Sequence, residues 1–443
     1  MSNSLTRLHD HLLKLRGLLL EDLSRTHYTP SEGSAISVKS LLQSLLSNGN
    51  PNPNVSEKQL QYSIKDFGLA CALLASSRSS THELLSWIPE GLSVSAKSAF
   101  SDLSRAYCAS GLGTEELSGL ECGLVSEEKR LVVELMPEVL PLLKDRVKES
   151  SIDKSVDGDE VCAATARVPV GYAILAAYQF RWFVTQVEYP HLGKLCTLVI
   201  PCGLTALDHW SPEIKGQGMI SFIHLGKNVN TAELVMYGDV ILDACCQNIA
   251  SSDEIWPYVV EMSVLLVSCI QRGNPRSQWF ERMLNEMLGH LERQPRNKDR
   301  RIAWLKYIEP LLCEVGVFLL AHFRRMFPLF FQWMHADDDQ TVLLVLKQIR
   351  TVIKLTWIRN TPYVERLVNE LVVLYKEAAL RIACEEIRTT ILEILLLIQR
   401  CKGPQFEACW DKYKDDLNLV TLNSSLSRNM LTNVCLQLEE TRC

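Results

Sequence analysis

Apolar residues recur every three or four positions through most of this chain, which is the spacing of one face of an α-helix. Residues 2–23 mix charges with a single leucine face made of Leu5, Leu8, Leu12, Leu15 and Leu19. Similar stripes run through 280–291 and 364–375. Alternating strand patterns are nearly absent, and the apolar run 195–201 continues with helical spacing, so it is predicted to be a helix that carries Pro201. The pattern therefore predicts an all-α protein.

One segment, 194–225, has the internal order of a helical hairpin. An apolar helix is followed by a short turn, a branched apolar residue with a basic one after it, and small residues at the start of a second apolar helix. This order resembles a HEAT repeat, and the residues that carry it are Pro201, Asp208, Ser211, Pro212, Lys215, Gly216 and Gly218. The small residues are expected where the two helices touch.

Starts of second helices recur along the rest of the chain. From Ile214 they fall near Trp256, Ile302, Val342 and Ile387, at intervals of 42, 46, 40 and 45 residues. Helical repeat arrays have periods of about 40–47 residues, and each hairpin is too thin to bury its apolar face alone. Accidental spacing in an ordinary helical protein is the alternative explanation. The spacing favours an α-solenoid of HEAT or armadillo-like hairpins.

Two stretches interrupt the helical pattern. Residues 47–56 are rich in Asn and Pro, and residues 148–160 are polar and acidic, so both are expected to be loops or linkers. We expect a divergent amino-terminal helical region over 1–150 and the HEAT-like solenoid over 161–443.

Charge and cysteine content narrow the class of protein. The chain has 46 basic and 52 acidic residues, a net charge of −6, so direct nucleic-acid binding is not expected and any anion binding needs a local patch. No apolar run is long enough to span a bilayer. Fifteen cysteines without a signal peptide suit reduced thiols. We expect a cytoplasmic protein without membrane contact, with the nucleus as a second compartment.

No arrangement of residues indicates catalysis. A phosphate-binding loop, a nucleophile elbow and a paired-histidine zinc motif are all missing from the sequence. His335 with the carboxylates at 337–339 is interpreted as an acidic turn that caps the following helix rather than as a cation site. Cys245 and Cys246 are interpreted as packing residues. We therefore expect no catalytic residue, cofactor or metal.

The densest basic segment is 293–301, which contributes Arg293, Arg296, Lys298, Arg300 and Arg301. These side chains are candidates for binding an acidic partner, although a solvated loop between two helices is the simpler explanation. Tryptophans at 279, 304, 333 and 357 occur in the same region, where they either pack the core or anchor an interface.

Residues 207–237 resemble the central signature of the TELO-two-interacting protein two family. The resembling features are Leu207-Asp208, Ser211-Pro212, the stretch 215–218 and the segment 228–234 before Tyr237-Gly238. The resemblance covers about 170–340 and does not extend to the first 150 residues.

This resemblance implies a HEAT or armadillo-like subunit of the Triple T complex, which also contains TELO-two and the larger TELO-two-interacting protein one. That complex acts with the ninety-kilodalton heat-shock chaperone and its R2TP cochaperone in maturing phosphatidylinositol-three-kinase-related kinases. The leading hypothesis is accordingly a non-catalytic adaptor or scaffold. A transport-type α-solenoid that binds protein cargo through the basic segment is the alternative, and an enzyme with a concave polar pocket is the third.

Overall fold

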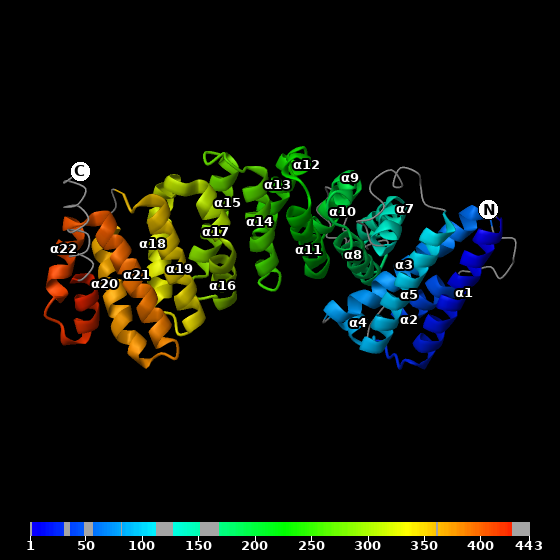
Figure 1. Ribbon diagram of the computed structural model, residues 1–443, viewed down its shortest axis with the longest axis horizontal. Helices are drawn as coiled ribbons and strands as arrows, with labels where there is room; N and C mark the ends of the chain where they lie inside the picture. Colours follow the sequence, from blue (N-terminus) through cyan, green and yellow to red (C-terminus); the bar gives the residue numbers. More distant parts are fainter. Residues whose placement is uncertain are drawn as a thin grey trace, which may run out of the picture. The chain divides into compact units, whose positions relative to one another are not determined.

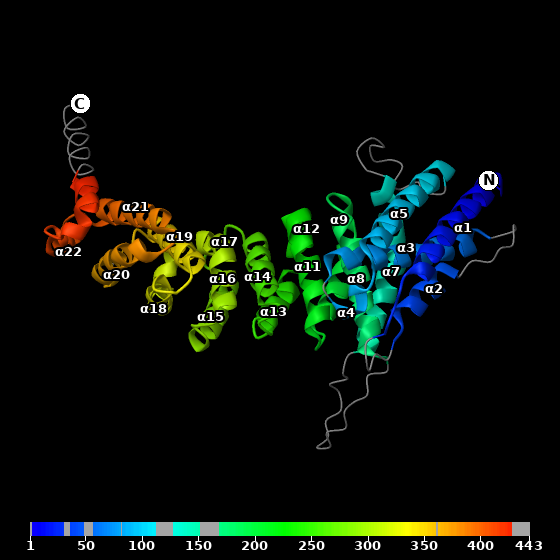
Figure 2. The ribbon, with the colours of Figure 1, turned by 90° about the horizontal axis from the view of Figure 1, so that it is seen from below.

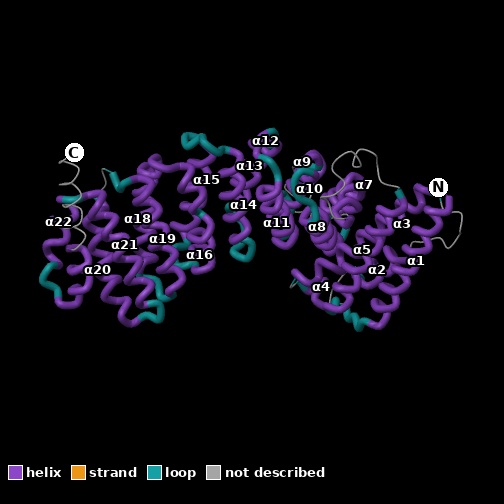
Figure 3. The backbone as a smooth tube through the Cα atoms, viewed as in Figure 1, coloured by secondary structure: helices purple, strands orange, loops and turns teal. Residues whose placement is uncertain are grey.

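The computed structural model of the 443-residue chain describes residues 2–30, 36–47, 56–80, 82–111, 127–150, 168–359 and 362–427, which form helices joined by turns and loops. No strand occurs among these residues (Figures 1 and 3). The predicted all-α fold is confirmed. Contacts divide the chain into two compact units, Met1–Ala244 and Cys245–Cys443, and each is built as an α-solenoid-type stack of helical pairs.

The first unit contains two rows of helices. One row is α1 (Ser2–Arg25), α5 (Glu90–Ser110), α7 (Glu127–Glu149) and α10 (Cys196–Leu207). The other is α2 (Val38–Ser47), α3 (Glu57–Ser76), α8 (Val170–Thr185) and α11 (Pro212–Asn228). Shorter elements are η1 (Ser77–Ser79), α4 (Glu83–Ser86), α9 (His191–Lys194), α12 (Thr231–Val235) and α13 (Gly238–Asn248), which carries the division between the units. Each helix packs on its neighbours in its own row.

Helices of opposite rows also pack in pairs, namely α1 with α2, α3 with α5, α7 with α8, and α10 with α11. The chain enters the second pair through α3, so that pair runs in the opposite row order from the other three (Figure 2). A strict repeat of identical hairpins would not show this reversal. The first unit is therefore a stack of helical pairs with one inverted member.

Local sequence explains where several of these helices begin and what they bury. Ser56 accepts a hydrogen bond from the Gln59 backbone while the Gln59 side chain accepts one from the Ser56 N–H, a capping box at the start of α3. In α1 the predicted leucine face is buried at Leu8, Leu12, Leu15 and Leu19. Burial of this apolar face against α2 and α5 stabilises the helix.

The second unit repeats the two-row arrangement. One row is α14 (Trp256–Ile270), α16 (Lys298–Tyr307) with α17 (Glu309–Val315), α19 (Asp339–Thr356) and α21 (Cys384–Lys402). The other is α15 (Gln278–Arg293), α18 (Phe323–Met334), α20 (Tyr363–Glu377) and α22 (Pro404–Trp410). Short helical turns are η2 (Gly316–His322), η3 (Ala378–Leu380), η4 (Asp411–Tyr413) and η5 (Leu417–Leu419). The predicted helix starts near residues 256, 302, 342 and 387 all belong to the first row.

The apolar stripes found in the sequence form the interior of this unit. All six apolar positions of α15 between 280 and 291 are buried. Of the eight apolar positions of α20 between 364 and 375, all are buried except Val373, which is 43% exposed. Trp304 and Trp333 pack edge to face with ring centroids 6.0 Å apart, and neither side chain reaches solvent. These stripes cover neighbouring helices rather than a ligand.

The units do not coincide with the regions 1–150 and 161–443. Helices α7 and α8 lie on either side of the expected linker, yet they form one of the packed pairs of the first unit. Residues 148 and 149 still belong to α7, and 151–160 lie outside the described residues. For the loop at 47–56, α2 ends at Ser47, Ser56 caps α3, and 48–55 are likewise outside.

Candidate partner-binding site

The basic segment 293–301 occupies the turn between α15 and α16. Arg293 is the last residue of α15, and α16 begins at Lys298 after the cap residue Asn297. The Asn297 side chain accepts a hydrogen bond from the backbone N–H of Arg300 at 3.2 Å, which satisfies a donor of the first turn. Helix α16 therefore starts inside the basic segment, and the helical geometry decides which side chains of that segment turn inward.

Arg300 turns inward. Its side chain is only 6% exposed and forms an ion pair with Asp253, a residue of the turn before α14. The guanidinium also donates to the Ser251 carbonyl at 2.9 Å and lies 4.6 Å from the centre of the Trp256 ring. The hydrogen bond from Arg300 lowers the pKa of Asp253. Arg300 thus joins two successive turns of the second unit.

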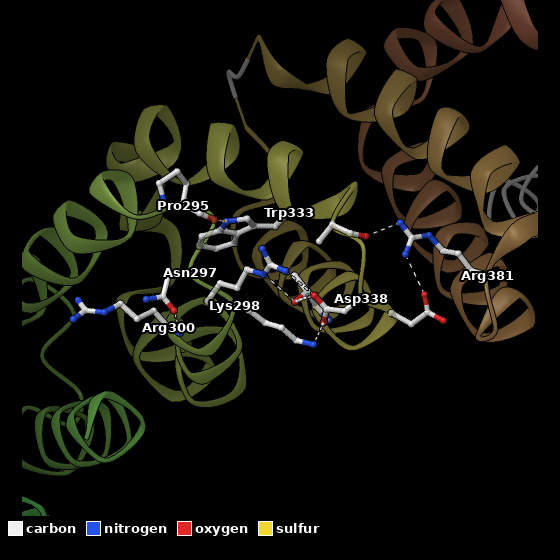
Figure 4. Close-up of polar contacts among 11 residues, drawn as sticks. Pro295, Asn297, Lys298, Arg300, Trp333, Asp338 and Arg381 are labelled. Atoms are coloured by element: carbon white, nitrogen blue, oxygen red, sulfur yellow. Dashed lines mark hydrogen bonds and ion pairs between the residues drawn. The ribbon is translucent and has the colours of Figure 1, made fainter. Parts of the chain in front are cut away.

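Arg301 makes the next connection in the same direction. It donates to Asp338 at 2.6 Å and to the hydroxyl of Thr341 at 3.1 Å (Figure 4). Asp338 also caps α19 by accepting from the Thr341 N–H at 2.9 Å. Burial opposes ionisation of Asp338, but the hydrogen bonds from Thr341 and Arg301 outweigh it, so its pKa is lowered. The acidic turn at 337–339 is a helix cap, as predicted, and also an anchor between repeats.

A third connection follows one repeat later. Arg381 donates to Asp339 at 3.1 Å and to the Ala336 carbonyl at 2.7 Å (Figure 4). The Ala383 N–H also donates to Asp339, at 2.9 Å. These bonds, first that from Ala383 and then that from Arg381, lower the pKa of Asp339. We call the set Asp253–Arg300, Arg301–Asp338 and Asp339–Arg381 the turn ladder. It ties each turn to the next across 37–47 residues of sequence.

This geometry divides the five basic candidates into two groups. Arg300 and Arg301 are held within the turn ladder, whereas Arg293, Arg296 and Lys298 are exposed. The Lys298 ammonium lies 4.0 Å from an Asp338 carboxylate oxygen, at the outer edge of the ladder (Figure 4). A partner can reach only the three exposed cations without unfolding the turn. Partner binding by these three stays a prediction.

The predicted repeat motif lies in α10 and α11 of the first unit. Pro201 is inside α10, Asp208 follows its last residue, and Ser211 is the cap residue of α11 with Pro212 at the first helical position. The Ser211 hydroxyl donates to the Glu213 carboxylate at 2.5 Å. The remaining motif residues, Lys215, Gly216 and Gly218, lie in α11, where both glycines are buried. The motif builds a hairpin.

Gly218 lies where these two helices touch. A Cβ atom at this position would be 3.0 Å from the Cβ of Ala206 and 3.4 Å from the Gly203 carbonyl oxygen. The distance to Ala206 is shorter than an ordinary van der Waals contact, so the glycine allows α11 to approach α10 closely. The predicted role of this small residue agrees with its position.

The four tryptophans of the basic region differ in exposure. Trp304 and Trp333 are core residues, and the indole N–H of Trp333 donates to the Pro295 carbonyl at 2.9 Å (Figure 4). Trp279 is half-buried. Trp357 is 60% exposed and ends α19 in a left-handed conformation with φ 54°. Trp357 is therefore the most exposed of the four tryptophans.

Across the described ranges, no three His, Cys, Asp or Glu side chains are grouped to hold a metal ion. Cys245 and Cys246 are both buried. Burial raises the pKa of Cys196 to about 11 and also raises that of Cys245. In the part of the chain that is described, no helix is long and apolar enough to cross a membrane.

Comparison with known proteins gives a close relative along nearly the whole chain. The Arabidopsis thaliana protein called "Uncharacterized protein At2g39910" is 57% identical over 426 residues, which is 96% of each chain. This chain belongs to the same family. No family model matches the sequence. The relative's name assigns no activity, so the function must be argued from more distant similarity and from the structure.

That more distant similarity is to TELO2-interacting protein 2. The human protein is 22% identical over 249 residues, covering 50% of this chain and 47% of its own length. The rat protein is 23% identical over 225 residues, covering 48% of this chain and 42% of its own. The chain thus matches less than half the length of these two relatives. The similarity supports the family resemblance seen at 207–237.

Proposed function

We propose that this protein is a non-catalytic adaptor subunit that binds TELO2-containing assemblies. The observation that carries the proposal is the similarity to human and rat TELO2-interacting protein 2 over about half of the chain. Stacked helical pairs suit this role, because repeat architectures of this kind present extended surfaces for protein partners. The expected partners are the TELO2 protein and the larger TELO-two-interacting subunit of the Triple T complex.

In this role the protein supports chaperone-dependent maturation of phosphatidylinositol-three-kinase-related kinases. It contributes binding surface and no catalytic residue, cofactor or metal. The heat-shock chaperone, R2TP and the kinases are indirect partners that reach it through the other two subunits. The compartment proposed for this activity is the cytoplasm, with the nucleus as a second site.

The first test is affinity purification of the tagged full chain from its own cells at moderate salt, followed by mass spectrometry. Recovery of the two other Triple T subunits is the expected result. Absence of both subunits from the bound fraction, with the tagged chain folded, would contradict the proposal. Transport factors in their place would favour the cargo-binding solenoid instead.

A second test locates the interface. We expect the second unit to hold the partner, with the exposed cations of the basic segment at the contact. The triple variant Arg293→Glu, Arg296→Glu and Lys298→Glu reverses three exposed charges, of which only that of Lys298 approaches the turn ladder, at 4.0 Å from Asp338. Its matched control reverses three exposed charges of the first unit, Arg7, Lys14 and Lys58. Loss of the other subunits only in the first variant supports this location, and equal recovery with both variants refutes it.

A further inference from the structure

A cleft of about 550 Å³ opens at one end of four helices in the first unit. Helices α3, α5, α7 and α8 pack in a closed circuit, each against two of the others. The cleft lies where α3 and α8 finish, at Ser76 and Thr185, and where α5 and α7 have their amino-terminal halves. Its volume falls within the range of about 300–1,000 Å³ that holds small molecules in proteins.

The wall of this cleft carries three cationic side chains from three different elements. Arg78 comes from η1, Lys97 from α5 and Arg181 from α8, and no carboxylate is among the described residues that line it. Glu90 lies 3.3 Å from Arg78, but both side chains are more than half exposed, so this ion pair neutralises little charge. The described lining of the cleft is therefore positively charged, although the chain as a whole has a net charge of −6.

Neutral donors accompany the cations. Hydroxyls of Ser79 and Thr185 and the amide of Gln186 also line the cleft, and the Arg181 guanidinium donates to the Ser79 hydroxyl. The Arg181 guanidinium carbon also lies 5.2 Å from the centre of the Tyr178 ring. The Ser79 hydroxyl and the Tyr178 ring hold the guanidinium in place at the wall of the cleft.

The apolar part of the lining is rigid. Phe100 and Trp182 pack edge to face with ring centroids 5.2 Å apart, and both are almost completely buried. Helices α3 and α8 end at the cleft, whereas the residues of α5 and α7 that line it lie more than one turn inside those helices, so the positive potential comes from the side chains and not from helix dipoles. The cleft therefore combines positive walls, hydrogen-bond donors and an apolar floor.

We infer that this cleft binds a small organic molecule through its phosphate groups. Arginine and lysine side chains with hydroxyl and amide donors are the groups that recognise phosphate. The volume exceeds what one phosphate ion needs, since a single water molecule occupies about 30 Å³ in the liquid. Several phosphates, or phosphates joined to an organic body against Phe100 and Trp182, would fill it. This inference does not depend on the proposed adaptor role.

The test is calorimetric titration of the full chain with tripolyphosphate, ATP, inorganic phosphate and a phosphoserine peptide at two salt concentrations. We expect the two polyphosphates to bind more tightly than inorganic phosphate, and the binding to weaken as salt rises. Failure of tripolyphosphate and ATP to bind would overturn the inference. Tightest binding of the phosphoserine peptide would also overturn it, because the ligand would then be a phosphorylated protein segment.

Charge-reversal variants place the binding in the cleft. Arg78→Glu with Lys97→Glu changes two exposed side chains, so the fold is expected to be retained, as circular dichroism would show. Each lost charge-assisted hydrogen bond is worth about tenfold or more in affinity, so binding should weaken at least tenfold. The matched control, Arg293→Glu with Arg296→Glu, makes the same change of net charge in the other unit. Equal weakening in both variants would refute the assignment.

Discussion

Replacing Gly218 by leucine should destabilise the contact between α10 and α11. A Cβ at Gly218 would lie 3.0 Å from the Ala206 Cβ and 3.4 Å from a Leu207 methyl carbon and from the Gly203 carbonyl oxygen. Two of these three neighbours are a Cβ and a backbone atom, which cannot move away by rotating a side chain. Leucine then adds three more carbon atoms beyond the Cβ.

Two effects of this substitution oppose each other. Leucine favours the helix over glycine by roughly 0.5–1 kcal/mol per residue, whereas overpacking a well-packed interior costs about 1–3 kcal/mol. Gly17 of α1 provides the matched control, because a Cβ there meets nothing within 4 Å. The Gly17→Leu variant therefore reports the helical preference alone. The difference between the two variants isolates the overpacking.

We expect the free energy of unfolding of Gly218→Leu to fall about 1–3 kcal/mol below that of Gly17→Leu. Urea titration followed by far-ultraviolet circular dichroism measures both variants beside the natural chain. Equal free energies for the two variants would refute the close approach of α10 and α11, and with it the repeat interpretation of the motif at 201–218.

Three further outcomes can be checked. Arg300→Met removes the guanidinium that lies over the Trp256 ring and leaves the Ser251 carbonyl without its donor. We expect urea titration to show that the free energy of unfolding falls by about 1–3 kcal/mol, against less than about 0.5 kcal/mol for the exposed Arg296→Met. Similar losses in the two variants would contradict the ladder. Because the pKa of Asp338 is lowered in the folded chain, its carboxylate contributes stability that is present above its unfolded pKa, near 3.9, and is lost as the pH falls through the folded value. In acid titrations between pH 5 and 3, the Asp338→Asn variant should therefore lose less stability than the natural chain. An equal loss in both proteins would argue against the pairing of Asp338 with Arg301. Cys313 is exposed and Cys245 is fully buried, so iodoacetamide at pH 8 should label Cys313 before Cys245, as peptide mass spectrometry would show. Early labelling of Cys245 would contradict its burial.

The helical stack could be predicted because its cause is local. In α15 and α20 the apolar positions already have the 3.6-residue period. Packing then buries all six between 280 and 291, and all of those between 364 and 375 except Val373. The starts of α14, α16, α19 and α21 could also be predicted, because a row of repeated helices keeps a nearly constant length of chain between its members. The reversed row order of the pair α3 and α5 could not be predicted, because a short connection between helices permits either order.

The turn ladder shows what local sequence leaves open. Arg296 and Arg300 are both basic residues of one segment, yet one is exposed and the other buried. The available signal was an acidic residue in each turn with an arginine one repeat away, as in Asp253 and Arg300 or Asp339 and Arg381. Charge alone does not say which of several arginines meets the carboxylate, because a surface charge in water and a paired charge look identical in sequence.

The sequence by itself determined an all-α chain of stacked hairpins, the buried stripes and the tight glycine contact of α10 with α11, since these depend on residue size and periodicity along one or two helices. Tertiary structure alone decided which basic residues remain exposed and that Arg78, Lys97 and Arg181 line one cleft. These residues are up to 103 positions apart in sequence, from 78 to 181. The packing of α3, α5, α7 and α8 brings them together, and no period in the sequence records that arrangement.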